Sequence, residues 1–251
     1  MQLGEKRRSV MGQLISELSW SGKRIRRYRN GGAGYENVLT AEVFQILDFL
    51  PREHFFGAII NSMQTCRETI QNQIYEEIEA GEFTLLPGNF YLKENPKSHQ
   101  EGYAVQPDAI LETPSVYCVI EVKRIKRSQF LRHQLSKEFY LATREAGKKI
   151  PFLFLVLREG PPIPVKGSGR IAIKDEIVNG LEAVHDIAQN HSLSVSQLKA
   201  LAADHYGWIT WPEIKDTISE QLGLYSNDSY STRKSIERLC NGIIDAIDRH
   251  S

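Results

Sequence analysis

Apolar residues recur at helical spacing near the start of the chain. Within residues 36–50, positions 39, 43, 46, 47 and 50 are all leucine, valine or isoleucine. This spacing predicts an amphipathic helix, and Pro51 predicts its end. Glu36 lies on the same stripe as Leu39 and Val43. Its carboxylate is therefore expected to face inward rather than toward water.

The same reasoning divides the rest of the chain into short helices and strands. Residues 83–92 predict a strand or hairpin, and the almost wholly apolar residues 150–158 predict a buried strand. A loop is expected at the Pro- and Gly-rich residues 160–169, and a break at residues 208–212. Helices are expected at residues 66–80, 128–146, 177–188, 195–206, 212–221 and 232–249. The chain as a whole is expected to be α/β.

Two further strands are expected within residues 103–126. Residues 104–111 and 116–123 are apolar runs, and the four residues between them are Glu-Thr-Pro-Ser, a turn signal. Both runs carry apolar side chains at odd and at even positions. Strands that are apolar on both faces belong in the middle of a sheet, so this pair is expected at its centre.

Charged residues gather at one end of this strand pair. If the pair is an antiparallel hairpin centred on residues 114 and 115, Asp108 lies directly opposite Glu121, on the same face of the sheet. Lys123 is two residues beyond Glu121 and points to that face too, which Ile110 and Val119 share. Two carboxylates and one ammonium group are therefore expected to converge beside a buried core.

The two carboxylates need compensation in such surroundings. Placing Asp108 and Glu121 beside an apolar core is unfavourable unless a partner offsets the loss of hydration. A divalent cation is a suitable partner, because Mg²⁺ binds carboxylate oxygens and leaves other positions to water and substrate phosphate. Mg²⁺ is therefore the expected cofactor, and Mn²⁺ its substitute.

The residues of this motif resemble a known pattern. Pro107-Asp108, twelve intervening residues and then Glu121-Val122-Lys123 are similar to the motif of the PD-(D/E)XK nuclease superfamily. The resemblance implies that the two acids and the main-chain carbonyl of Val122 bind Mg²⁺. It also implies that Lys123 positions or activates the attacking water.

The resemblance covers residues 36–158 and implies a fold. A restriction-endonuclease-like core is expected, with a central mixed β-sheet flanked by helices, followed by a helical C-terminal region. A bare Asp…Glu-x-Lys motif also occurs by chance in charged chains. The alternative is that Glu121 and Lys123 are an exposed ion pair at a strand end, worth about 0–1 kcal/mol.

The resemblance gives two more residues a role. Many members have an acid on the first core helix that reaches the metal, and Glu36 is the expected equivalent. Glu42 competes for this role, although the apolar stripe points it sideways. The alternative for Glu36 is a helix-start acid stabilised by the helix dipole by about 0.3–1 kcal/mol. Some members have a glutamine near the active centre, to which Gln134 would correspond, although its spacing matches no subgroup closely.

Several residues are expected to contact nucleic acid, mainly through its phosphates. They are Arg24, Arg26 and Arg27 in an N-terminal arm, Arg124, Lys126 and Arg127 after the motif, and Gln134. The alternative for the arm is a solvated segment without a ligand. The formal net charge of +0 argues against nonspecific coating of nucleic acid and allows a local basic patch.

Composition narrows the class of protein further. The 251 residues are 41% hydrophobic and 25% charged, as in ordinary globular proteins. The 3 cysteines have neither metal-ligand nor disulfide-framework spacing, which favours the reducing cytoplasm. No apolar run approaches the ~20 residues that span a bilayer, so no membrane association is expected. Three regions are expected: a basic arm (1–34), a nuclease-like core (35–170) and a helical C-terminal region (171–251).

The expected function is that of a Mg²⁺-dependent phosphodiesterase, specifically an endonuclease acting on double-stranded DNA. One alternative is a nuclease for RNA or single-stranded DNA, for which Tyr103, Tyr117 and Tyr140 would be the stacking residues. Others are an inactive nuclease-fold module that binds nucleic acid or protein, and a helical adaptor with a structural hairpin. A homodimer would suit the cutting of two strands. Restriction or phage defence is the pathway that the resemblance to this family implies. DNA repair and recombination are equally compatible with the residues of the motif.

Overall fold

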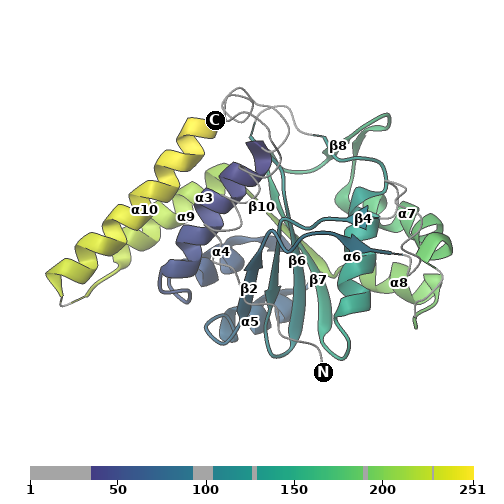
Figure 1. The fold of residues 1–251 in the computed structure, drawn as a ribbon, viewed down its shortest axis with the longest axis horizontal. Helices are drawn as coiled ribbons and strands as arrows, with labels where there is room; N and C mark the ends of the chain where they lie inside the picture. Colours follow the sequence, from purple (N-terminus) through teal and green to yellow (C-terminus); the bar gives the residue numbers. More distant parts are fainter. Residues whose placement is uncertain (1–34, 93–103, 126–128, 189–191, 228) are drawn as a thin grey trace.

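A mixed sheet of six strands lies at the centre of the protein (Figure 1). The computed structural model describes residues 35–92, 104–125, 129–188, 192–227 and 229–251. The strands of the sheet lie in the order β1–β10–β7–β6–β5–β2. The strands are β1 (Gln64–Thr65), β2 (Glu82–Leu85), β5 (Ala109–Glu112), β6 (Val116–Val122), β7 (Ile150–Leu157) and β10 (Tyr206–Thr210). The predicted α/β class with a mixed sheet is therefore confirmed.

The centre of the sheet is formed by the two most apolar strands. Every residue of β6 is buried, and so is every residue of β7 after Ile150. β6 pairs antiparallel with β5 and parallel with β7. A parallel neighbour requires a crossover, and α6 (Gln134–Glu145) supplies it. β6 and β7, which are apolar on both faces, thus lie in the middle of the sheet. The single strand predicted at residues 104–111 is wrong, because Ala104–Val105 form β4 in a separate two-stranded sheet and β5 begins only at Ala109, next to the edge strand β2.

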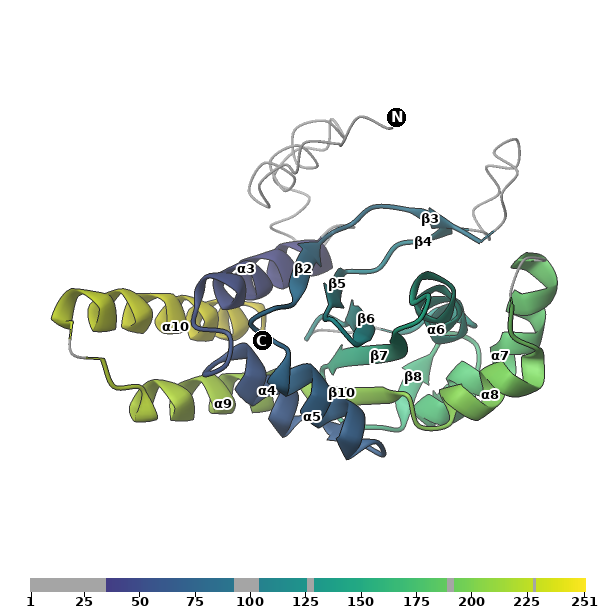
Figure 2. The same ribbon diagram turned by 90° about the horizontal axis from the view of Figure 1, so that it is seen from below.

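Helices cover both faces of the sheet (Figure 2). One face packs against α3 (Tyr35–Phe49), α4 (Phe56–Ser62), α5 (Glu68–Glu76), α9 (Trp211–Leu224) and α10 (Tyr230–His250). The other face packs against α6, α7 (Ile173–Ala188) and α8 (Val195–Ala202). Among the described residues, no helix is long and apolar enough to cross a membrane.

The C-terminal region contributes a strand as well as helices. β10 pairs in parallel with β7, from Tyr206 opposite Leu153 to Thr210 opposite Leu157. The break predicted at residues 208–212 is therefore wrong. Residues on both sides of position 170 contribute strands to the same sheet, so the boundary expected at position 170 does not separate two structural units. The C-terminal region is also not purely helical, because it contains β10.

The start of α6 also differs from the prediction, which began the helix at position 128. Phe130 instead forms a bridge to Val165, with its N–H donating to the Pro164 carbonyl at 2.9 Å. His133, with a φ of 62°, then precedes the first residue of α6. Leu131, which lies in this non-helical segment, is 59% exposed.

Two smaller strand pairs flank the sheet. β3 (Phe90–Tyr91) pairs with β4 (Ala104–Val105), whereas β2 pairs with β5, so residues 83–92 do not form the hairpin considered from the sequence. β8 (Ile163–Val165) and β9 (Gly169–Ile171) form a hairpin where a loop was predicted. α5 is shorter than predicted, because the chain continues as turns after Glu76.

Candidate active site

The register of β5 and β6 brings the predicted acids to one end of the pair. Ala109 lies opposite Ile120, and Ile110 lies opposite Val119. One step beyond the Ala109–Ile120 pair, Asp108, the residue before β5, lies level with Glu121 in β6. The turn symmetry therefore predicted the correct register. The expected faces are also confirmed, since Ile110 and Val119 belong to one apolar cluster and Ala109 and Ile120 to the other.

A carboxylate directly after α5 stabilises the turn that sets this register. Glu77 accepts hydrogen bonds from the Thr113 hydroxyl at 2.6 Å and from the Ser115 N–H at 2.9 Å and hydroxyl at 2.7 Å. Partial burial opposes ionisation of Glu77, but these hydrogen bonds outweigh it and lower the pKa of the carboxyl. The turn is thus held by a charged acceptor that prefers to stay ionised.

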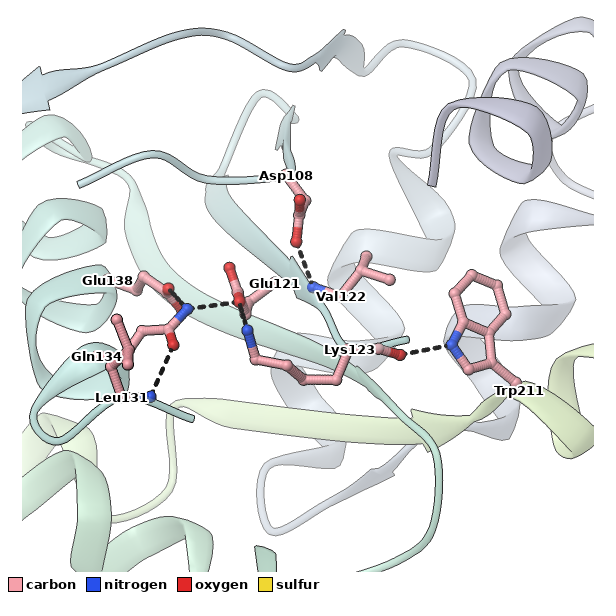
Figure 3. Close-up of polar contacts among 8 residues, drawn as sticks. All are labelled: Asp108, Glu121, Val122, Lys123, Leu131, Gln134, Glu138 and Trp211. Atoms are coloured by element: carbon pink, nitrogen blue, oxygen red, sulfur yellow. Dashed lines mark hydrogen bonds and ion pairs between the residues drawn. The ribbon is translucent and has the colours of Figure 1, made fainter. Parts of the chain in front are cut away.

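Asp108 is held by the neighbouring strand. It is 9% exposed, and its Oδ2 accepts a hydrogen bond of 2.8 Å from the Val122 N–H (Figure 3). Its own carbonyl accepts from the Leu86 N–H at 2.9 Å. Main-chain groups of two other segments therefore hold Asp108, the Val122 N–H through its carboxylate and the Leu86 N–H through its carbonyl.

Glu121 and Lys123 form a buried ion pair. The Lys123 Nζ lies 2.5 Å from Glu121 Oε1, and their side chains are only 10% and 4% exposed. The alternative of an exposed strand-end pair is therefore wrong. The Lys123 Nζ also lies 4.8 Å from the ring centroid of Phe130. A cation over an aromatic face gains electrostatic attraction, which helps to offset burial of the ammonium.

The main chain at Lys123 is fixed from both sides. Its N–H donates to the Val156 carbonyl at 2.7 Å, continuing the pairing of β6 with β7. Its carbonyl accepts a hydrogen bond of 2.7 Å from the indole N–H of Trp211 (Figure 3). Trp211 is fully buried at the start of α9, which Thr210 and Glu213 cap reciprocally. The C-terminal region thus orients the end of β6.

Gln134 and Glu138 bring α6 to the site. Gln134 Nε2 donates to Glu121 Oε1 at 2.6 Å and to Glu138 Oε1 at 3.0 Å (Figure 3). The structure thus places Gln134 beside the motif, as the resemblance implied. Glu138 was not predicted, although a signal was present. It lies three residues after Leu135 and one before Phe139, inside the buried stripe of α6, where a charged residue is unusual.

Glu138 has a strongly perturbed carboxyl group. Burial, the charge of Glu121 and hydrogen bonding to Glu121 raise its pKa well above the usual range, against the opposing charge of Lys123. A protonated Glu138 can donate a hydrogen bond to the Glu121 carboxylate. The charges of Glu121 and Lys123 then balance each other, and Asp108 is a second, largely buried carboxylate at the same cavity.

Contacts with α7 fix the start of α6 and therefore Gln134. Glu176 accepts from the His133 N–H at 2.7 Å, and the Ser136 hydroxyl donates to the Glu176 carbonyl at 2.8 Å. Gly180 allows this close approach, because a Cβ there would lie 2.2 Å from the Ser136 hydroxyl oxygen. Gln134 is thus presented to Glu121 by two packed helices.

The charged groups line a small polar cavity. Its volume is about 160 Å³, and Asp108, Glu121, Lys123 and Gln134 all contribute to its wall. Within the described ranges, no three His, Cys, Asp or Glu side chains are grouped to hold a metal ion. Two carboxylates nevertheless suit Mg²⁺, which binds through one or two carboxylates and keeps several waters.

The remaining predicted residues are not all placed at the site. Glu36 lies in α3, and its side chain is outside the described part, so its role stays a prediction. The competing Glu42 pairs instead with Arg249 and His250, at 3.8 and 3.4 Å. Arg124 is half-buried directly after Lys123. Arg24, Arg26, Arg27, Lys126 and Arg127 lie outside the described residues.

Two of the three tyrosines considered for base stacking are buried. Tyr117 is 7% exposed and Tyr140 is fully buried, both within the apolar cluster under α6. Tyr103 lies outside the described residues.

Comparisons with protein-family models, with curated proteins and with solved structures found no match.

Proposed function

We propose that this chain is a Mg²⁺-dependent phosphodiesterase, and specifically a DNA endonuclease. One observation carries the proposal. Asp108, Glu121 and Lys123 converge, largely buried, on one polar cavity at the end of the β5–β6 pair. Buried charges that a fold does not need for packing are typical of functional sites. The resemblance of the motif to PD-(D/E)XK nucleases points to the same chemistry.

Each residue of the cluster has a distinct proposed role. Asp108, Glu121 and the Val122 carbonyl would hold Mg²⁺, which when bound polarises a phosphate and makes a bound water more acidic. Lys123 would hold the attacking water or neutralise the charge that develops on the phosphate. Gln134 and Glu138 are positioning residues, since they act on Glu121 through hydrogen bonds. Glu36 would complete the metal site directly or through water.

A second candidate function is a metal-free module that binds nucleic acid or protein. The observation that favours it is the network itself. Glu121 Oε1 already accepts hydrogen bonds from both Lys123 and Gln134. A network that is satisfied without a cation could be purely structural. The two functions differ in their response to divalent ions.

The experiment that tests the proposal is cleavage of supercoiled plasmid, single-stranded DNA and RNA in Mg²⁺, Mn²⁺ or EDTA. Wild type is compared with Asp108→Asn and with the double variant Glu121→Gln, Lys123→Met, which keeps no unpaired charge at the buried pair. Lys149→Met is the matched control, because Lys149 forms a 2.8 Å ion pair with Glu112 at the other end of the hairpin. Metal-dependent cleavage by wild type and the control, lost in both site variants, supports the proposal. Absence of cleavage on every substrate in every metal contradicts it.

A further inference from the structure

A second, larger cavity lies beside the acidic one. Its volume is about 410 Å³, within the range of ligand pockets. Lys123 lines both cavities, so the ammonium proposed to meet the scissile phosphate also borders the larger space. Any group that occupies this space would lie directly next to the reacting phosphate.

The wall of the larger cavity combines apolar side chains with cations. Pro164 is its partly exposed apolar residue, and it is backed by Phe130, Leu157 and Ile163, which are 1%, 2% and 1% exposed. Arg158 and Arg170 add guanidinium groups, and Glu159 is an acid in the same wall. Apolar surface beside guanidinium groups suits a nucleotide, whose base is largely apolar on its faces and whose phosphate is an anion.

The Arg170 guanidinium is available for such a phosphate. Its partner in the structure is Glu159, at 2.6 Å, with side chains that are 46% and 51% exposed. An exposed ion pair of this kind contributes little to stability. Exchanging the Glu159 carboxylate for a phosphate therefore has a small cost, and a guanidinium binds phosphate with two parallel hydrogen bonds.

The cavity is also preformed. β8 and β9 pair from Ile163 opposite Ile171 to Val165 opposite Gly169. The segment before α6 is tied to this hairpin, since the Phe130 N–H donates to the Pro164 carbonyl and the Phe130 carbonyl accepts from the Lys166 N–H, both at 2.9 Å. A fixed wall lowers the entropic cost of ordering a ligand.

We propose that this cavity binds the nucleotide next to the scissile phosphate, with its base against Pro164 and its own phosphate on Arg170. This inference rests on the proposed function and specifies its substrate. A base can enter the cavity only outside a base-paired stack. The bound strand is therefore unpaired at the cleavage position, as in single-stranded DNA, frayed ends or junctions.

The test measures oligonucleotide binding in EDTA, which removes divalent ions and so prevents metal-dependent cleavage of the probe. The probes are a fluorescein-labelled oligothymidylate and a blunt hairpin duplex, followed by fluorescence anisotropy. Wild type is expected to bind the single strand more tightly than the duplex. Arg170→Ala should weaken single-strand binding about tenfold, the effect of losing one charge-assisted contact. Gln129→Glu, at an exposed position of the cavity wall, should also weaken it by adding negative charge.

The matched control is Arg67→Ala. Arg67 forms an ion pair with Asp204 at the same 2.6 Å, with side-chain exposures of 48% and 30%, and it does not line the cavity. Equal binding of both probes, or the same small effect of Arg170→Ala and Arg67→Ala, would overturn the inference. If metal-dependent cleavage persists in that case, only the nucleotide subsite is wrong. If no nucleic acid is bound or cleaved, the proposed function fails with it.

Discussion

The main-chain N–H of Val122 donates a hydrogen bond of 2.8 Å to the carboxylate of Asp108. This contact links the end of β6 to the residue that precedes β5, so the two proposed metal ligands are held by the sheet itself. Sites on rigid strands hold their geometry better than sites on loops. The contact also separates the structural role of Asp108 from its proposed chemical role, because an amide oxygen can accept the same hydrogen bond.

Asp108→Asn is therefore expected to fold and to lose metal binding. In EDTA its free energy of unfolding should lie within about 1 kcal/mol of the wild-type value. A hundredfold excess of Mn²⁺ over its Kd should stabilise wild type by about 2.7 kcal/mol and the variant by almost nothing. Urea unfolding with and without Mn²⁺ measures this difference. Asp204→Asn, far along the chain from the motif, should respond as wild type does, and an equal Mn²⁺ response in Asp108→Asn would contradict the metal site.

Lys123→Met should destabilise the fold strongly, because it leaves Glu121 buried without its cation. Removing one partner of a buried ion pair costs about 3–5 kcal/mol. The double variant Glu121→Gln with Lys123→Met removes both charges and should recover a large part of that loss. Urea unfolding of the single and double variants measures the coupling. Lys149→Met removes a more exposed pair and should cost about 1 kcal/mol. Additive losses in the double variant would show that the pair is not coupled.

The hairpin part of the site was predictable because its contacts are local. The turn at positions 112–115 and the period of two along each strand were enough to place Asp108 level with Glu121 and to point Lys123 to the same face. The sequence could not distinguish a buried from an exposed Glu121–Lys123 pair. Burial depends on α6, whose start was misplaced because Phe130 pairs with β8 instead of continuing a helix.

The long-range part of the site was not predictable. The indole of Trp211 contacts the carbonyl of Lys123 from 88 residues away, and β10 enters the sheet between β1 and β7. Neither the spacing of apolar residues nor the residue types of turns indicates which distant segments contact each other. Glu138 is an intermediate case, since its place in the apolar stripe of α6 is visible in the sequence, whereas its contact with Gln134 and its raised pKa require the tertiary structure.

Glu77→Gln should weaken the turn in a manner that depends on pH. The pKa of Glu77 is lowered in the folded state from 4.5, so its contribution to stability is present above that value and is lost as the pH falls through the lower folded pKa. At neutral pH the variant should lose about 1–3 kcal/mol, because the hydrogen bonds of Thr113 and Ser115 lose a charged acceptor. Urea unfolding at neutral pH and well below pH 4.5 measures this. If the free energies of unfolding of wild type and Glu77→Gln differ by the same amount at both pH values, the ionised carboxylate has no role in stabilising the turn.

Glu138→Gln is expected to be tolerated and Glu138→Ala is not. The glutamine amide can donate a hydrogen bond to Glu121, as the protonated acid does, so stability should change by less than about 1 kcal/mol. Alanine leaves a void between α6 and β6 and should cost about 2–4 kcal/mol. Urea unfolding distinguishes the two variants. If glutamine is as destabilising as alanine, the buried carboxyl is needed in its charged form, which would contradict the raised pKa.

Trp211→Phe tests whether the C-terminal region orients the end of β6. The substitution keeps an aromatic ring but removes the donor to the Lys123 carbonyl, and a smaller ring leaves part of a fully buried site empty. The free energy of unfolding should fall by about 2–3 kcal/mol. Trp208→Phe is the matched control, on the preceding strand and only partly buried, and should cost about 1 kcal/mol. Urea unfolding gives both losses, and the plasmid assay should show reduced metal-dependent cleavage for Trp211→Phe alone. Equal effects of the two substitutions would mean that the indole contributes only volume, and that β6 is oriented by its strand pairing.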